Sequence, residues 1–464
     1  MRGRSSGDGA LRWAAFVLAP AWLVQLAAPP AQATIAYDVY AGVNATDNVR
    51  LTQTARRADV ISTVGFDLDW REERRLLETD VQADLSYLDY ARGSFSPGVV
   101  GNFIGLGRFN IVPEKFSWMV SDNFGQEQIN PLTPVTPQNR ENVNYLSTGP
   151  DVTLPLGSAA ALLLDGRYSK VSYQTSDLGS NRYSGSLGVL RQLSSSSSIS
   201  INVEDQLNRF DNSNLNPDYD EQQAFIHYNK KGVRTRFDAQ IGYARLKLRD
   251  GGTTTGEPMV RAEVTRQLSP RTSVVLTGGH EYSDASDDFR LLQALGGANL
   301  ATQAVQPTGI PFKNNYVTLG LKYQRDRTGF GLDFGHYGMT YIQHFASALS
   351  AALDERRNTA VLSASRRLSP LVDAQLSFSY ERDIFDESIN TSQFFTGTAQ
   401  LNWHMTQKVG LAFLYAYTRR ESNLPEGSYY DNILWLRVTY GRVAQVPSGS
   451  VVPRLPVLPN QTGY

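Results

Sequence analysis

Cysteine is absent from this chain of 464 residues, and histidine occurs only five times. Without cysteine the protein has neither a disulfide scaffold nor a thiolate metal site. Beyond the N-terminal stretch, no segment approaches 18 consecutive apolar residues, which excludes a membrane-spanning helix there. The formal net charge is −1, so there is no basic excess that would favour nucleic-acid binding. The order of the residues is more informative than their composition.

The pattern is an alternation of apolar and polar residues with a period of two, from about Tyr37 to Tyr440. Ala374, Leu376 and Phe378, for example, are each followed by a polar residue. Successive side chains of a strand point to opposite faces, so each segment has one apolar and one polar face. About twenty such segments cannot all bury their apolar faces in a water-soluble core. A transmembrane β-barrel places these faces against lipid and turns the polar faces to a lumen.

The connections between these segments alternate in length. Short ones, such as 112–115 and 369–371, follow every second strand, and longer ones, such as 127–141 and 284–313, follow the others. Bacterial outer-membrane barrels have short periplasmic turns and longer outer loops. We therefore predict an all-β, antiparallel up-and-down barrel of about 20 strands in the bacterial outer membrane, with 18 strands as the alternative.

The two ends of the chain differ from the barrel segment, residues 34–442. Residues 1–33 combine three arginines, an apolar stretch and a small-residue cleavage site at Ala31–Ala33, which are typical of a secretory signal peptide. The alternative is an uncleaved membrane anchor. Residues 443–464 contain four prolines after position 446 and cannot form a strand. We expect this tail in the periplasm, either as a disordered end or docked on periplasmic export machinery.

The longest connection, 284–313, has helical spacing over residues 289–303, although Gly296 and Gly297 interrupt it. Loops of this length are usually functional or mobile. The segment would either fold into the barrel as a constriction or lie outside as a lid. An inward segment would favour gated export, whereas an open lumen would favour diffusion.

A short phrase recurs near the short turns, as Arg191-Gln192-Leu193-Ser194 and again from Arg266 and from Arg366. A basic residue at the headgroups, an apolar residue at the interface and a turn former suit a strand that leaves the lipid. We interpret the phrase as structural.

No constellation of residues indicates catalysis. His336 and His344 are eight residues apart on one strand, too far to share a metal, and His280-Glu281 lacks a partner. No glycine-rich phosphate loop follows a strand. We therefore expect no enzyme activity, no catalytic residues, no metal and no cofactor.

The polar faces give the candidate lumen-lining residues. They mix both signs of charge with amides, which suits water and neutral or weakly charged polar solutes, whereas a phosphate-selective pore would need a ring of arginine and lysine. The alternative is that they only hydrate and brace a wide barrel. The candidates are Asp67, Asp69, Asp84, Asp238, Gln240, Lys322, Gln375, Glu381, Trp435 (which could stack on a sugar) and Arg437.

Over roughly residues 110–185 the chain carries more specific motifs. They include Val112-Pro113-Glu114-Lys115-Phe116-Ser117-Trp118, Asp122-Asn123-Phe124-Gly125-Gln126 and Gly166-Arg167-Tyr168-Ser169, with Arg182 further on. This region resembles the outer-membrane β-barrel proteins of the porin 2 type that accompany exopolysaccharide and exosortase (PEP-CTERM) systems. The resemblance implies a pore or assembly component for a secreted polysaccharide, and it carries over no residue with a defined role.

Three polar residues end the proline-rich loop of this region. Asn139, Arg140 and Asn142 would either fold the loop over the pore mouth or cap the next strand. We predict an outer-membrane channel for export of an exopolysaccharide or its oligomers, without an energy source of its own. Its partners would be outer-membrane lipid and the polysaccharide. The alternatives are a passive porin for small polar solutes and a non-conducting surface scaffold.

Overall fold

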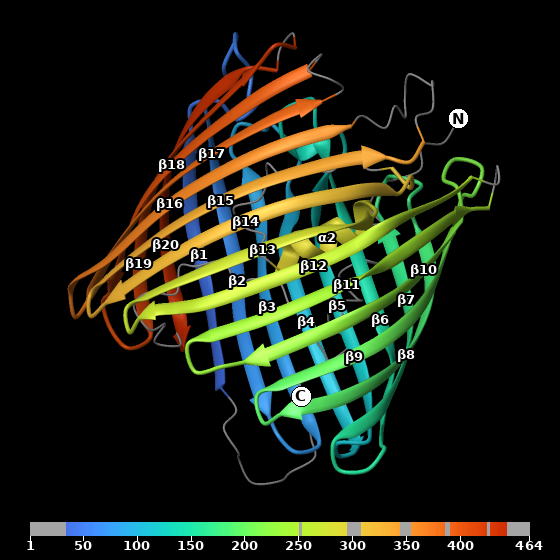
Figure 1. Ribbon diagram of the computed structural model, residues 1–464. Helices are drawn as coiled ribbons and strands as arrows, with labels where there is room; N and C mark the ends of the chain where they lie inside the picture. The colour runs from blue at the N-terminus through green and yellow to red at the C-terminus, as the bar shows by residue number, and fades with distance from the viewer. Residues whose placement is uncertain are drawn as a thin grey trace.

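The computed structural model describes residues 34–249, 253–294, 308–343, 354–385, 390–424 and 427–442. Twenty strands form one closed antiparallel sheet, in which each strand pairs with its neighbours in sequence (Figure 1). The sheet closes where β1 pairs with β20, from Tyr37 opposite Arg442 to Thr46 opposite Ile433. The predicted all-β barrel of 20 strands is confirmed, and the alternative of 18 is wrong. The expected signal peptide and C-terminal tail lie outside the described residues.

The strands are 12 to 16 residues long, enough for a tilted strand to cross a bilayer. In chain order they are β1 (Thr34–Thr46), β2 (Asp59–Glu73), β3 (Leu77–Tyr90), β4 (Gly98–Val112), β5 (Phe116–Gln128), β6 (Arg140–Pro155), β7 (Ala160–Tyr173), β8 (Ser180–Ser194), β9 (Ser197–Phe210), β10 (Tyr219–Lys231), β11 (Thr235–Leu248), β12 (Thr254–Ser269), β13 (Thr272–Ser283), β14 (Phe312–Arg325), β15 (Thr328–Tyr341), β16 (Glu355–Ser369), β17 (Val372–Phe385), β18 (Asn390–His404), β19 (Val409–Ser422) and β20 (Tyr429–Arg442).

In the described residues, two short helical segments interrupt the connections. A 3-10 helix, η2 (Pro137–Asn139), precedes β6, and an α-helix, α2 (Ala285–Ala294), follows β13. Within the described ranges, no helix has both the length and the apolar character needed to cross a bilayer.

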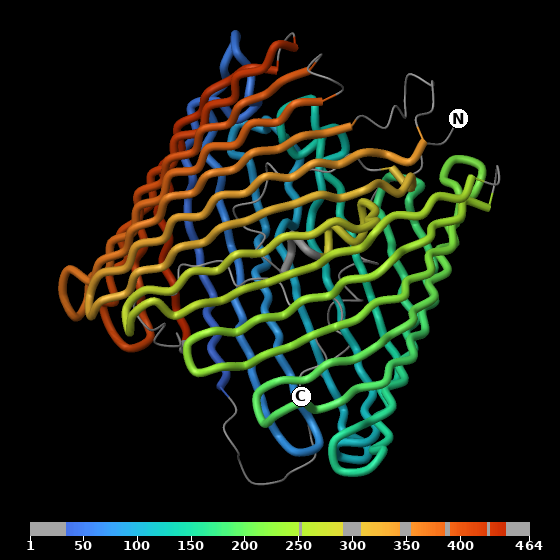
Figure 2. Tube along the Cα trace, viewed as in Figure 1, coloured from blue at the N-terminus to red at the C-terminus, as the bar shows by residue number. Residues whose placement is uncertain are grey.

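The two ends of the barrel differ as predicted. The trace shows tight hairpins at one end, such as the turn between β16 and β17, and longer connections at the other (Figure 2). In bacterial barrels the longer loops face the outside of the cell. The end that bears α2 is therefore the outer end.

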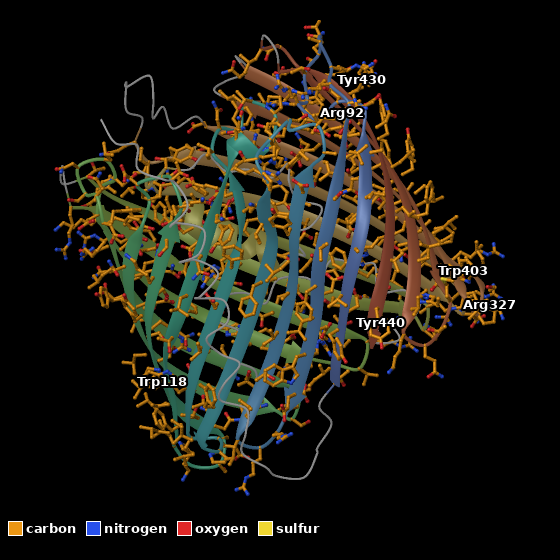
Figure 3. The ribbon with its side chains drawn as sticks, turned by 180° about the vertical axis from the view of Figure 1, so that it is seen from behind. Arg92, Trp118, Arg327, Trp403, Tyr430 and Tyr440 are labelled. Atoms are coloured by element: carbon orange, nitrogen blue, oxygen red, sulfur yellow. The ribbon has the colours of Figure 1, made fainter. Side chains whose placement is uncertain are left out.

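The outer surface of the wall is apolar, with aromatic residues toward both ends. On β20, Leu434, Leu436 and Val438 are 44–49% exposed, and Tyr430 and Tyr440 flank them at 41% and 55%. Figure 3 shows Tyr430 toward the outer end, and Tyr440, Trp118 and Trp403 toward the short-turn end. Ten residues at about 3.3 Å each, tilted by about 40°, span roughly 25 Å, the height of a lipid-facing band. This surface places the barrel in the bacterial outer membrane.

The recurring phrase marks a β-bulge at three short turns. The pairing register shifts between Gln192 and Ser194, between Gln267 and Ser269, and between Arg367 and Ser369. The leucine skipped by each bulge is about half exposed on the lipid side of the turn. The serine Oγ then accepts a backbone N–H two residues later, at 3.2 Å in all three turns. The phrase is thus a turn-forming device, which agrees with its structural interpretation.

Candidate functional site in the barrel lumen

Helix α2 begins where Asp284 caps it. The Asp284 Oδ1 atom accepts hydrogen bonds from the backbone N–H groups of Ser286 and Asp287, both at 3.0 Å. Asp287 and Asp288 lie in the first turn, where carboxylates favour the positive end of the helix dipole. The helix lies within the barrel (Figure 1), close to β4 and β5. The described part of the longest connection is therefore an inward constriction. Its helix starts at Ala285, earlier than the predicted 289–303.

A buried ion-pair cluster fixes the first turn of α2 to the barrel wall. Arg182 on β8 donates from Nη2 to Asp284 Oδ2 at 2.5 Å and from Nη1 to Asp287 Oδ2 at 3.2 Å. The hydroxyl of Tyr219 on β10 donates to the same Asp284 oxygen at 2.6 Å. The side chains of Arg182 and Asp284 are only 3% and 1% exposed. Their charges are removed from water, so each depends on the other for compensation.

The next turn of the helix packs against an apolar cluster on the wall. Phe289 is 3% exposed and packs in a cluster with Tyr145, Val171 and Tyr173 of β6 and β7. The guanidinium of Arg290 lies over the Tyr145 ring, 5.1 Å from its centroid. Burial of an aromatic side chain contributes about 1.5–3 kcal/mol. Side-chain contacts to the wall thus hold α2, because no strand pairing joins it to the sheet.

The chain returns to β14 past a second anchor. The backbone N–H of Gly309 donates to Asn216 Oδ1 at 3.0 Å, and Asn216 Nδ2 donates to the carbonyl of Asp177 at 2.8 Å. A Cβ atom at Gly309 would lie 2.6 Å from the Cβ of Asn216, so this approach requires glycine. The inward connection is therefore held at both described ends.

The acidic groups of α2 experience different environments. Burial raises the pKa of Asp284, but the Arg182 charge and the Tyr219 hydroxyl outweigh it, so the pKa lies below its ordinary value. Burial raises the pKa of Asp288 to about 7, and the Ser283 hydroxyl, at 3.0 Å, and the charge of Arg357 oppose this rise only in part. The constriction thus contains one carboxylate fixed in its charged form and one that titrates near neutral pH.

A second segment, residues 129–139, crosses the outer end of the barrel from β5 toward β19. Asn139 folds it: its Nδ2 donates to the Asn130 carbonyl at 2.9 Å, and its Oδ1 accepts the Asn130 N–H at 2.8 Å. Arg420 on β19 donates from Nη2 to the carbonyls of Pro131 and Leu132, at 3.1 and 2.9 Å. Arg420 is 1% exposed and lies over Phe394. This one side chain therefore holds the loop to a distant part of the wall.

The three predicted pore-mouth residues have different positions. Asn139 shapes the crossing loop as described. Arg140 starts β6, and its buried Nε has no hydrogen-bond partner among the residues that the structure describes. Asn142 accepts from Gln126 at 3.1 Å, on the face of β6 opposite the residues that pack against α2. Glu141, between Arg140 and Asn142, is buried, and its carboxylate accepts hydrogen bonds from the backbone N–H groups of Thr175 and Ser176, both at 2.8 Å.

The ten predicted lumen-lining residues lie on the strand faces opposite the exposed apolar side chains. Four of them meet where the barrel closes: Arg437 contacts Asp67 at 3.3 Å and lies near Trp435, while Asp84 accepts from Tyr40 at 2.9 Å. The other six are dispersed. Three of them contact a neighbouring side chain: Asp69 contacts Arg71, Asp238 contacts His227, and Gln240 contacts Arg261. The other three lie near or opposite a polar residue: Glu381 lies beside Asp383, Lys322 lies near Asp333, and Gln375 lies opposite Gln400. A role in transport stays a prediction for all ten.

The histidines belong to the wall. His227 and His404 contact the carboxylates of Asp238 and Asp373, both at 2.9 Å, and His336 contacts the Asn358 amide at 2.8 Å. His344 lies outside the described residues. Within the described part of the chain, no group of three or more histidine or acidic residues is arranged to hold a metal.

Sequence reasoning missed the residues that fix the inward segments. Asp284 did carry a signal, because an aspartate directly before a helix with two acids in its first turn is a typical N-cap pattern. Arg182 and Arg420 carried none as fixing residues, because their partners lie 102 and 289 residues away.

No protein-family model matches this chain, and no curated protein matches it in sequence. Solved structures match it at low TM-scores. The FrpB iron transporter from Neisseria meningitidis has a TM-score of 0.44 and 10% identity, over 88% of this chain and 81% of that one. The copper transporter OprC gives 0.43 and 11%, over 89% and 82%. OccK2 from Pseudomonas aeruginosa gives 0.37 and 8%, over 88% and 98%. Nothing about substrate or mechanism follows from likenesses of this degree. The closed 20-strand sheet and its apolar exterior are those of a bacterial outer-membrane β-barrel.

Proposed function

We propose that this barrel is a gated outer-membrane conduit for the export of a polysaccharide or its oligomers. Helix α2 acts as the constriction. The observation that carries the proposal is the position of this helix inside the barrel, where it contacts Arg182 and Tyr219 and packs through Phe289 in an apolar cluster on the wall. A gate needs a closed state that a limited set of contacts stabilises, and the contacts of α2 with the wall are such a set.

The chemistry of the inner wall supports a saccharide substrate. Carboxylates, amides and hydroxyls lie together with aromatic side chains, as in the group of Tyr40, Asp84, Trp435 and Arg437. Sugars bind through hydrogen bonds to such groups and by stacking on aromatic rings. The sequence resemblance to barrels of exopolysaccharide systems points to the same class. The sequence has no glycine-rich phosphate loop after a strand, so we attribute the driving force to synthesis or to a periplasmic machine.

Deletion of the gene, followed by assay of polysaccharide in the medium and in the periplasm, tests the proposal. We expect secreted material to fall and periplasmic material to rise, with recovery when the full chain is restored. Unchanged secretion together with slower uptake of small solutes would indicate a passive porin instead. Unchanged secretion and uptake with lost surface protein would indicate a scaffold.

The tail provides a separate test of partner docking. A chain that ends at residue 442 retains every described strand, so we expect it to form the barrel. If periplasmic machinery docks on residues 443–464, this chain restores conductance but not secretion. Full secretion would show that the tail is dispensable.

A further inference from the structure

A groove of about 600 Å³ lies at the outer end of β19 and β20. Its lining includes Tyr417, Arg419 and Tyr430 from the strands, and Gln53 from the connection between β1 and β2. Tyr430 stands on the same face of β20 as Leu434, Leu436 and Val438, which form part of the lipid-facing band. The side chains of Tyr417, Arg419 and Tyr430 therefore face the membrane, whereas Arg420 and Tyr429, which also border the groove, are buried on the opposite face.

The level of the groove matches the headgroups of the outer leaflet. Tyr430 is the second residue of β20 at the long-loop end, whereas Tyr440 marks the opposite interface (Figure 3). Roughly 25 Å of apolar wall separates the two tyrosines. A molecule in this groove would have its acyl chains against that wall and its polar head beside Arg419.

Two guanidinium groups flank the groove. Arg419 pairs with Glu421 on the same strand, and its side chain is 53% exposed. Arg56 lies over the Tyr430 ring, 4.0 Å from its centroid, and contacts Asp47 at 3.3 Å. Both ion pairs are exposed to solvent and weak, so a stronger anion can replace the carboxylates. Arginine binds phosphate with two parallel hydrogen bonds, and the tyrosine faces offer stacking surfaces for sugar rings.

From this geometry we infer that the groove binds the phosphorylated saccharide headgroup of an outer-leaflet glycolipid, of which lipid A is the representative. The ligand contributes one phosphate to Arg419 and a second phosphate to Arg56, a sugar ring to Tyr430 and Tyr417, and acyl chains to the apolar wall. This site is independent of the proposed transport function, because its lining includes neither α2 nor the residues that hold α2 to the wall.

Native mass spectrometry of the full chain in detergent tests the inference. The probes are diphosphoryl lipid A, monophosphoryl lipid A and phosphatidylglycerol, each with and without inorganic phosphate as competitor. We expect diphosphoryl lipid A to bind about tenfold more tightly than the monophosphoryl form, since one charge-assisted contact is lost. Equal affinity for the two forms, or full displacement by inorganic phosphate at equal concentration, would overturn the inference.

Substitutions complete the test. The double variant Arg56→Ala and Arg419→Ala should lose about tenfold or more in affinity for diphosphoryl lipid A. The control Arg327→Ala, in the short turn at the other end of the barrel, should bind like the parent (Figure 3). Glu421→Gln frees Arg419 from its neighbouring carboxylate and should strengthen binding, a gain that misfolding cannot mimic. Unchanged lipid affinity in a folded double variant refutes the site, and a change only in oligomeric state would assign the groove to a second copy of the chain.

Discussion

Replacement of Arg182 by alanine should release α2 from the barrel wall. The substitution removes the contacts at 2.5 and 3.2 Å to Asp284 and Asp287 and leaves the Asp284 carboxylate, 1% exposed, with only Tyr219 and the helix N–H groups as partners. Breaking a buried ion pair in this way costs about 3–5 kcal/mol. Because the Tyr219 bond remains, we take the lower value, which shifts the ratio of docked to released helix by roughly 100-fold.

Planar-bilayer recordings measure this shift directly. We expect Arg182→Ala to show a larger or more frequently open conductance than the parent protein. The matched control is Arg167→Ala, which breaks the ion pair between Arg167 and Asp151 in the wall. Both of these side chains are 15% exposed, and the pair does not involve α2. A folded Arg182→Ala barrel with the conductance of the parent would refute the reasoning, as would an equal increase in the Arg167→Ala control.

Three further predictions test other parts of the account. Docking of α2 should weaken as the pH rises from about 4 to about 7. In the docked helix the pKa of Asp288 is raised to about 7, whereas in the released helix the residue loses its proton near pH 3.9, so docking requires a proton over this range. Asp288→Asn should reduce this pH dependence of conductance, and Asp287, whose pKa burial also raises, should supply the remainder; a dependence as large as that of the parent would contradict the role of Asp288. Arg420→Ala should cost the crossing loop about 1.5–3 kcal/mol, since two hydrogen bonds to a charged donor are lost, and should make residues 129–139 a site of limited proteolysis in the folded barrel. Leu362→Lys, in the middle of the lipid-facing band, should destabilise the barrel in vesicles by about 2–4 kcal/mol, whereas Leu368→Lys at the interface should cost about 0–1 kcal/mol; equal costs in denaturant titrations would contradict the assigned membrane level.

The barrel could be predicted from the sequence because strand alternation is local. The residues around Leu376 and Phe378 show which face is apolar, and the register between neighbouring strands follows once the short turns are fixed. The same reasoning located the lumen-facing residues, since a side chain such as Gln240 must point away from the exposed Ile241.

The inward segments could not be predicted in the same way. Their positions depend on contacts between residues distant in sequence, such as Arg182 with Asp284 and Arg420 with Pro131. The sequence predicts a helix in the long connection, but the spacing of its apolar residues indicates residues 289–303. Its true start is set by the Asp284 cap, which is a hydrogen-bonding signal and not a hydrophobic one.

The position of α2 inside the barrel is tested most directly by cross-linking in cells, because the chain contains no native cysteine. A pair of cysteines at Phe289 and Val171, which belong to one buried cluster, should cross-link with a short reagent and lower the conductance of the purified protein. A pair at Phe289 and Gln400, on β18, should not react. Cross-linking of the second pair but not the first, or no change in conductance after the first forms, would contradict a helix docked on this wall as the gate.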